Sequence, residues 1–479
     1  MSNSQINWLL LSNAALGNFL AGTSSRIFSV SLPTIAASLE TTIIGISWAV
    51  IAYQISQISL SLIFGRIGDL YGRHKLFALG LVVSSLAALM CGLAQNAGQL
   101  ILFRFFQGIG ASMTQSQGRA LALESMPKES SGRAQGFMTT AFHTGVLIGP
   151  SLGGLIIDTI HWRAIFFFLI PIALSALLLT LINWRKGNVP QRSATAGPRE
   201  SIDYLGALLL IGCTAALVAA IDHRIMEAFA PAMRVVLVMI LALLIAGFLY
   251  REWTTPSPIL DLSLFKIRMF TLSSLTLLLV GVAQVMIGFV LPFYLQDVLR
   301  LTPTFIGLLF ISAPIFTVTL SPLVGWAVDK VGPRLPATAG IAFLTAAAFY
   351  GSYLRSDSHW LSAVVVLGLW GLATALFFTA NHTAMITSVP DQHRGVATGA
   401  IYVVFGLGTT IGVSLGTLLL TAAFRYYTGD PTATATAANP AMFVRAMNFS
   451  FMIGGVIALG AMLCSGLRGK TNATPSRTT

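Results

Sequence analysis

The sequence predicts an all-α integral membrane protein built from two repeated helical bundles. Apolar residues make up 55% of the 479 residues and charged residues only 9%, so the chain cannot cover a water-exposed surface. Long apolar runs follow one another from end to end. The segment GRIGDLYGRHK at 65–75 returns, degenerate, as GWAVDKVGPRL at 325–335. Gly65, Asp69 and Gly72 each recur 260 residues later, which indicates a duplicated bundle.

Runs of about 18 or more mostly apolar residues predict fourteen membrane helices. In chain order they lie near 8–31, 43–64, 76–95, 99–122, 134–157, 162–183, 204–221, 233–250, 269–292, 304–326, 335–354, 359–381, 397–420 and 443–466. The helices at 204–221 and 233–250 match nothing in either half and are interpreted as an insertion. The expected domains are an N-terminal six-helix bundle at 1–183, a cytoplasmic linker at 184–203, two additional transmembrane helices at 204–250, a C-terminal six-helix bundle at 251–468 and a cytoplasmic tail at 469–479.

The distribution of Lys and Arg gives the expected orientation. With fourteen helices threaded, 18 of the 28 cations fall on one side and 7 on the other, while Arg26, Arg104 and Arg119 lie inside helices. Cations accumulate on the cytoplasmic side of a membrane, so we expect both termini in the cytoplasm and the chain in the cytoplasmic membrane. The net charge of +12 is then mostly topology, and no nucleic-acid partner is expected.

The segment at 65–75 is predicted to be a short loop between two helices. Glycine permits a tight turn, and Asp69 can sit at a helix N-terminus. These residues resemble the signature of the major facilitator superfamily, and the resemblance covers nearly the whole chain. It implies two six-helix bundles that open alternately to either side of the membrane, with two additional helices in this chain. The resemblance assigns a gating role to Gly65, Asp69, Gly72, Arg73 and Asp329.

The predicted helix at 134–157 contains GVLIGPSLGG. Its glycine spacing gives a smooth face for close packing, and Pro150 removes a backbone hydrogen bond. A generic packing face explains the spacing but not the Gly-Pro pair. The string resembles the antiporter motif of drug:proton exchangers, and with fourteen helices it implies the fourteen-helix drug:proton antiporter branch. The motif residues are Gly145, Gly149, Pro150, Gly153 and Gly154.

The first helix departs from that branch. The segment AGTSSRIFSVSLPTIA carries Ser24 where the branch places an acid and Arg26 where it places a threonine. None of the sixteen acidic residues falls near the middle of a predicted helix. Arginines without a nearby carboxylate would make an electropositive cavity that prefers anions. Two alternatives stay open, namely that Arg104 reaches the exterior interface, and that helix carbonyls, Glu124 or water satisfy the arginines.

Polar side chains inside the helices are the candidate site residues, because a charged group at membrane depth needs a cavity or a partner. His143 is the mid-depth group whose reference pKa lies near neutrality, so it is the candidate for proton coupling. A histidine in such a bundle can equally be a packing residue, and His382 is a weaker candidate. The candidate substrate-binding residues are Arg26, Gln57, Arg104, Gln107, Gln115 and Arg119.

These observations predict a secondary active transporter that exports a small organic solute, anionic or neutral, by proton-coupled alternating access. The alternatives are a broad-specificity multidrug efflux pump, an organic-anion symporter or uniporter, and a membrane sensor or structural protein. No nucleotide-binding loop, catalytic motif or metal-ligand spacing occurs in the sequence, so neither an enzyme nor a cofactor nor a metal is expected. The expected partners are a small-molecule solute, protons and membrane lipid, and no obligate protein partner is evident.

Overall fold

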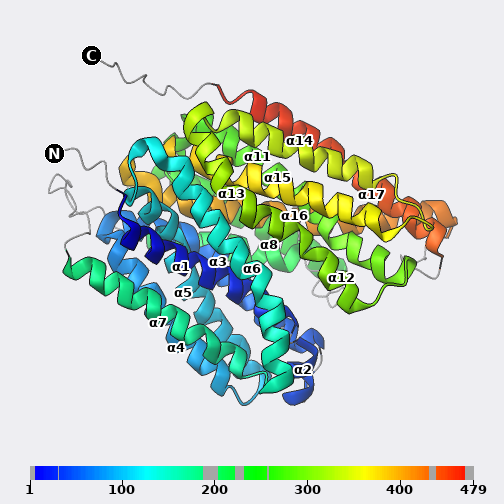
Figure 1. The fold of residues 1–479 in the computed structure, drawn as a ribbon, viewed down its shortest axis with the longest axis horizontal. Helices are drawn as coiled ribbons and strands as arrows, with labels where there is room; N and C mark the ends of the chain where they lie inside the picture. The colour runs from blue at the N-terminus through cyan, green and yellow to red at the C-terminus, as the bar shows by residue number, and fades with distance from the viewer. Residues whose placement is uncertain are drawn as a thin grey trace.

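The computed structural model describes residues 6–30, 32–41, 43–186, 203–221, 231–255, 258–430 and 439–469, and these residues fold into helices and short connections (Figure 1). The predicted linker falls mostly at 187–202 and the predicted tail at 470–479, which lie outside the described residues. The start of the helix predicted at 8–31 is joined to the end of the helix predicted at 99–122 by a hydrogen bond from Asn7 N to Ser125 O at 2.8 Å. Because both of these ends are predicted to be cytoplasmic, this bond marks the predicted cytoplasmic end of the bundle.

The first six long helices pack on one another to form the N half, drawn in blue to green in Figure 1. Their apolar faces bury a shared core in which Phe77 and Leu121 are fully covered. The elements of this half are α1 (Trp8–Val30), α2 (Leu32–Ser38), α3 (Ile43–Tyr71), α4 (Arg73–Leu93), α5 (Ala97–Glu124), η1 (Lys128–Ser130), α6 (Ser131–Thr159) and α7 (Ala164–Arg185).

The last six long segments form the C half in the same packing order. One of them is interrupted at Ile311, between α12 and α13, but Phe305–Val331 still forms one span long and apolar enough to cross a membrane, where the sequence predicted a helix at 304–326. The elements of this half are η2 (Leu262–Lys266), α11 (Arg268–Phe293), η3 (Tyr294–Val298), α12 (Pro303–Phe310), α13 (Ser312–Val331), α14 (Arg334–Gly351), α15 (Trp360–Thr387), η4 (Asp391–His393), α16 (Arg394–Thr428) and α17 (Pro440–Gly466).

Between the halves in sequence come α8 (Tyr204–Ile221) and α10 (Pro231–Thr254). They pack on each other, and α8 also contacts α3 of the N half and α16 of the C half. An ion pair from Arg251 Nε to Asp203 Oδ2 at 2.9 Å joins their ends. The helix α8 therefore lies along one side of the junction between the halves, with α10 packed on it.

Within the described residues, ten helices are long and apolar enough to cross a membrane. α1, α5, α8 and α14 do not meet that standard, and in α5 the reason is a run of Gln, Ser and Arg side chains. The all-helical membrane fold is confirmed, whereas the number fourteen and the domain boundaries remain predictions.

The segment at 65–75 is not the loop that the sequence predicted. α3 continues to Tyr71, and only Gly72, with φ of 109°, makes the turn into α4. Its counterpart Gly332, with φ of 78°, makes the equivalent turn between α13 and α14. A positive φ is strained for any residue with a Cβ, so the turn at each copy needs its glycine.

Candidate functional site

The two halves meet at the predicted cytoplasmic end through two helix pairs, α3 with α16 and α6 with α13. A methyl group at Gly395 would lie 2.4 Å from the carbonyl oxygen of Gly65. A methyl group at Gly325 would lie 2.5 Å from the carbonyl oxygen of Gly132. The two crossings are related by the sequence repeat, and at each of them backbone touches backbone. The halves are therefore closed against each other at this end.

Asp69 ties the first crossing together. Its carboxylate accepts hydrogen bonds from the backbone N–H groups of Gly395 and Val396, both at 3.0 Å. Asp69 thus caps the N-terminus of α16 in the opposite half, rather than the helix that follows it in sequence. Arg73 donates to Asp69 at 2.9 Å from Nε, pairs with Glu124, and donates to the carbonyl oxygen of Asp391 across the junction at 2.5 Å. We call these groups the first latch.

Asp329 ties the second crossing together. Its carboxylate accepts from the backbone N–H of Gly132 at 2.6 Å and from that of Arg133 at 3.2 Å, so it caps the N-terminus of α6. The Arg133 side chain also donates to it from Nε at 3.0 Å. We call these groups the second latch. The position of Arg73 is taken here by Pro333, and the counter-charge comes from the opposite half instead.

The structure thus places the candidate gating residues Gly65, Asp69, Arg73 and Asp329 at the junction, with Gly72 at the adjacent turn. The sequence analysis missed their partners on α6 and α16. A signal for them was present, because Gly132 and Gly395 are 263 residues apart. The same offset of 263 residues separates Gly145 from Gly408, on the same two helices.

The glycines of the 145–154 segment pack α6 against α1. A methyl group at Gly145 would lie 2.4 Å from the carbonyl oxygen of Phe19, and one at Gly153 would lie 2.9 Å from the Ile27 side chain. Gly149 packs against the α1 backbone as well, whereas Gly154 has nothing within 4 Å. Pro150 stands inside the helix. Three glycines of the motif, Gly145, Gly149 and Gly153, therefore lie at one close crossing of α6 with α1 within the N half.

Arg104 lies in a cage inside the N half. Its side chain is 1% exposed, and its guanidinium stacks on the rings of Phe28 and Tyr53, at 4.7 and 4.3 Å from their centroids. Nη1 donates to Gln107 Oε1 at 2.8 Å. The cage supplies cation–π contacts and one acceptor, so Arg104 does not reach the exterior surface.

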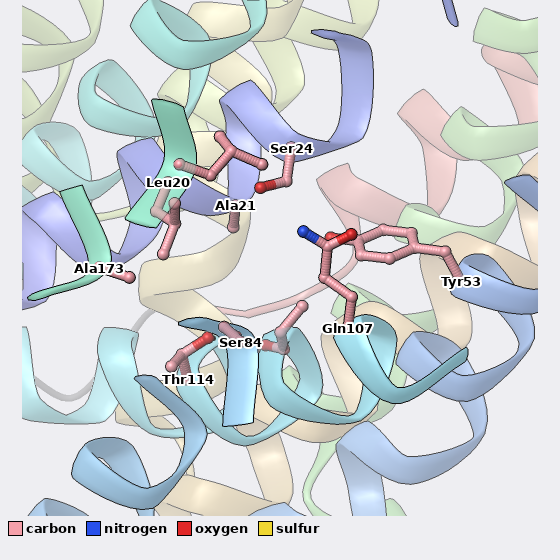
Figure 2. A pocket seen from close by; sticks show the side chains of 10 residues that line it. Leu20, Ala21, Ser24, Tyr53, Ser84, Gln107, Thr114 and Ala173 are labelled. Atoms are coloured by element: carbon pink, nitrogen blue, oxygen red, sulfur yellow. Dashed lines mark hydrogen bonds between the residues drawn. The ribbon is translucent and has the colours of Figure 1, made fainter. Parts of the chain in front are cut away.

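Beside the cage, Ser24 and Gln107 point into a cavity of about 10 Å³ (Figure 2), which is room for about one water molecule. The structure thus brings Gln107 together with Arg104, which lies three residues earlier on the same helix. In this closed state the cavity is too small for an organic solute.

Arg26 and His143 lie between α1 and α6. Arg26 is exposed, and its Cβ lies 3.5 Å from where a methyl group on Gly149 would stand. His143 is half-buried, packs edge-on against Phe142, and interacts electrostatically with Arg26 and Arg119. Arg26 is thus a neighbour of His143, whereas the contacts of Arg104 belong to its cage.

Arg119 lies deeper, toward the latches. It is 4% exposed, and Nη1 donates to Gln135 Oε1 on α6 at 2.9 Å. His382 on α15 of the C half is 5% exposed and interacts electrostatically with Arg119 and His143. Gln115, one turn from Arg119, is buried, and Gln57 on α3 is half-buried. The meeting of Arg119 with His143 and His382 could not be seen in the sequence, because it depends on how three helices are rotated.

The chain is similar to known proteins over nearly its whole length. The family model described as the Major Facilitator Superfamily matches residues 14–284 and 273–478. The riboflavin transporter RibZ of Clostridioides difficile is 28% identical over 85% of this chain and 87% of its own length. The multidrug resistance protein Stp of Mycobacterium tuberculosis is 30% identical over 86% of this chain and 75% of its own. The multidrug export protein EmrB of Escherichia coli is 27% identical over 85% of this chain and 79% of its own length.

Two solved structures share the fold. The human organic anion transporter MFSD10 is 13% identical with a TM-score of 0.63, over 95% of this chain and 99% of that one. The proton:xylose symporter XylE is 16% identical with a TM-score of 0.65, over 96% and 95%. At these identities the likeness concerns the architecture alone.

Proposed function

The chain belongs to the Major Facilitator Superfamily, and we propose that it exports a small organic solute in exchange for protons. It is a multi-pass membrane transporter, and its relatives are transporters rather than enzymes. We assign it to the fourteen-helix drug:proton antiporter branch, in the cytoplasmic membrane with both termini in the cytoplasm. The branch assignment is supported by similarity to Stp and EmrB, and the orientation by the cation asymmetry of the sequence.

The latches support alternating access as the mechanism. Both hold the halves together at one end through caps on helices of the opposite half. Hydrogen bonds of this kind can be broken and remade without unfolding either half. The described state is then the one closed to the cytoplasm, and release of both latches opens the pathway to it.

One observation carries the export part of the proposal. The glycine face of α6, interrupted by Pro150, lies directly on the α1 backbone. This contact seals the N half along the segment that resembles the antiporter motif. Close packing of α6 on α1 leaves no space for water between these helices, and this limits proton leakage, as an exchanger requires.

The substrate follows from this chain's own residues, because the relatives differ in what their names specify, riboflavin for one and several drugs for others. Every acidic residue in the described helices lies within a few residues of a helix end, whereas Arg104 and Arg119 are buried within α5. We propose an anionic or neutral solute, bound by residues from the set Arg26, Gln57, Arg104, Gln107, Gln115 and Arg119, with His143 as the proton-coupling group.

The test is coupled flux in proteoliposomes. Purified protein is reconstituted with a pH-sensitive dye in the lumen, and a pH gradient drives uptake of matched cationic, neutral and anionic solutes. We expect anionic or neutral solutes to move one way while protons move the other. Protein-free liposomes and the Gly460→Ala variant, whose new methyl group would meet nothing within 4 Å, serve as controls.

An organic-anion symporter or uniporter is the second candidate, favoured by the interior arginines. In the same assay, protons that accompany the solute indicate symport, and solute flux without proton movement indicates uniport. Export of cationic drugs of several types would support the broad multidrug pump instead. A chain that moves no solute of any charge would be a sensor or structural protein, and the transport proposal would fall.

A further inference from the structure

Buried hydrogen-bond donors without acceptors occur in both halves, on α5 of the N half and on α15 of the C half. Arg119 Nε and Gln115 Nε2 on α5 have no hydrogen-bond partner within the described chain, and neither does either ring nitrogen of His382 on α15. The three side chains are at most 5% exposed. Arg119 keeps one acceptor, Gln135 Oε1. Buried polar groups are almost always paired in proteins, so such an excess of donors requires an explanation.

The nearest carboxylate on α5 cannot supply the missing acceptor. Glu124 lies at the end of α5, where it is bonded to Arg73 and lies 3.7 Å from His74 Nε2. The charged and titratable groups that interact with His382 are Arg119 and His143, both from the N half. Each of these can carry positive charge or donate, so closing the halves gathers donors and cations with no anion among them.

The C half adds an aromatic wall beside these donors. The Phe378 ring lies 5.4 Å from the His382 ring, and Phe405 on α16 stands edge-on to Phe378 at 5.1 Å. A flat apolar group could pack on these rings while an attached anion accepts from Arg119 and His382. This combination of groups fits an aromatic carboxylate, in which a charged end and a flat body are joined.

We propose that Arg119, Gln115, His143 and His382 form an anion site shared by the two halves, and that an aromatic carboxylate bound there favours closure toward the cytoplasm. An empty closed site leaves a buried cation short of acceptors, which is costly at membrane depth. A bound carboxylate accepts from both halves and removes that cost in the closed state only. A ligand that binds one state better shifts the population toward it. The inference rests on the proposed transport of an organic solute and names its chemical class and its site.

The experiment measures closure directly in the full chain. Spin labels are placed at the exposed positions Glu129 in η1 and Gln392 in η4, in a variant whose three cysteines are replaced by alanine, and the protein is put in lipid nanodiscs. Benzoate is the probe, with benzamide as its neutral isostere and acetate as the carboxylate without a ring. Benzoate should raise the ratio of closed to open distances about fivefold or more, the low end of typical couplings. Benzamide should leave the ratio unchanged, and acetate should act more weakly than benzoate.

Melting temperature is recorded in parallel, so that a protein already closed without ligand still reports binding as thermal stabilisation. Arg119→Gln and His382→Gln should each abolish both responses. Either variant alone suffices if the other fails to fold. Arg445→Gln removes the same charge from an exposed position on α17 and should respond like the wild type.

The absence of any benzoate effect on distances and melting in the wild type would overturn the site. So would a full response in both Arg119→Gln and His382→Gln, and an equal response to acetate would remove the aromatic wall from the proposal. Neither readout requires transport. Benzoate binding without proton-coupled flux would therefore refute the proposed exchange while the site stands, and flux without benzoate binding would do the reverse.

Discussion

The two halves share a scaffold but keep their charges in different places. The N half buries Arg104 and Arg119 within α5, whereas no lysine or arginine within a described helix of the C half is buried. The latches repeat this asymmetry. Asp69 is paired with Arg73 of its own half, whereas Asp329 takes its counter-charge from Arg133 of the other half. Duplication has conserved the backbone contacts and left the electrostatics free to differ.

This difference predicts unequal behaviour when the halves separate. In the first latch Asp69 and Arg73 belong to the same half, so opening breaks the hydrogen bonds to α16 and to the Asp391 carbonyl but does not separate Asp69 from its counter-charge. In the second latch opening also separates an ion pair. That pair is worth little, because the Arg133 side chain is 42% exposed and exposed pairs contribute about 0–1 kcal/mol. The first latch is the more buried one, since the Arg73 and Asp69 side chains are 12% and 1% exposed, and it should therefore control closure more strongly.

The largest effect should come from filling a crossing. Gly395→Ala would place a methyl group 2.4 Å from the Gly65 carbonyl oxygen, and backbone atoms cannot rotate away. Overpacking costs about 1–3 kcal/mol, so the closed state should lose about 5- to 140-fold in population, at tenfold per 1.4 kcal/mol. Solute flux and the distance between residues 129 and 392 measure this loss. Gly460→Ala is the matched control, and normal closure in Gly395→Ala would show that the crossing tolerates separation.

The second-largest effect should come from removing the negative charge of Asp69 in the first latch. Asp69→Asn leaves Arg73 with Glu124 alone and weakens the cap on α16, so we expect turnover to fall about tenfold, or about 1.4 kcal/mol. Asp329→Asn loses a partly exposed pair and should reduce turnover about two- to fivefold. Initial rates at equal expression test both. If Asp329→Asn is as damaging as Asp69→Asn, the asymmetry between the latches has no functional meaning.

The duplication could be predicted from the repeated glycines. A close helix crossing has no room for a side chain, so glycine recurs at the equivalent position of each half. The glycines did not reveal that Asp69 caps α16, since the partner of a latch lies on another helix. The predicted loop at 65–75 was wrong because Gly65 and Gly68 stay helical. Backbone and the Gln117 side chain pack directly against them.

Pairs on one helix, such as Arg104 and Gln107, could be predicted from their spacing. The meeting of Arg119 with His382 could not, because hydropathy does not give the rotation of a helix whose faces are both polar. The interruption at Ile311 did carry a signal, because Pro314 lacks the backbone N–H that would donate to the carbonyl of Phe310, where α12 ends.

Moving negative charge into the first helix of the N half should change substrate preference rather than turnover. Ser24→Asp with Arg26→Thr restores the residue types expected in the branch and reverses the local charge beside the Arg104 cage. At separations of about 8–10 Å and an effective dielectric near 20, one charge alters binding by about 2 kcal/mol. The preference for cationic over anionic solutes should then rise about tenfold or more. Arg26→Ala alone should weaken transport of anions. Export of a permanent dication by the unmodified protein would contradict the charge argument.

The smallest change should be in pH dependence rather than in rate. His143 lies between Arg26 and Arg119 in the N half, and no described residue of the C half matches it in this position between two arginines. Glutamine keeps the polarity and approximate size of the side chain but cannot titrate. His143→Gln should therefore stay close to the wild-type rate at the pH optimum and lose the wild-type variation of flux across the acid to neutral pH range, because no titrating side chain is left at this position. Flux measured across that range tests this, with the exposed His161→Gln as the control. If the variant retains the wild-type pH profile and still exchanges protons, His143 is a packing residue, and the asymmetry of the halves concerns substrate charge alone.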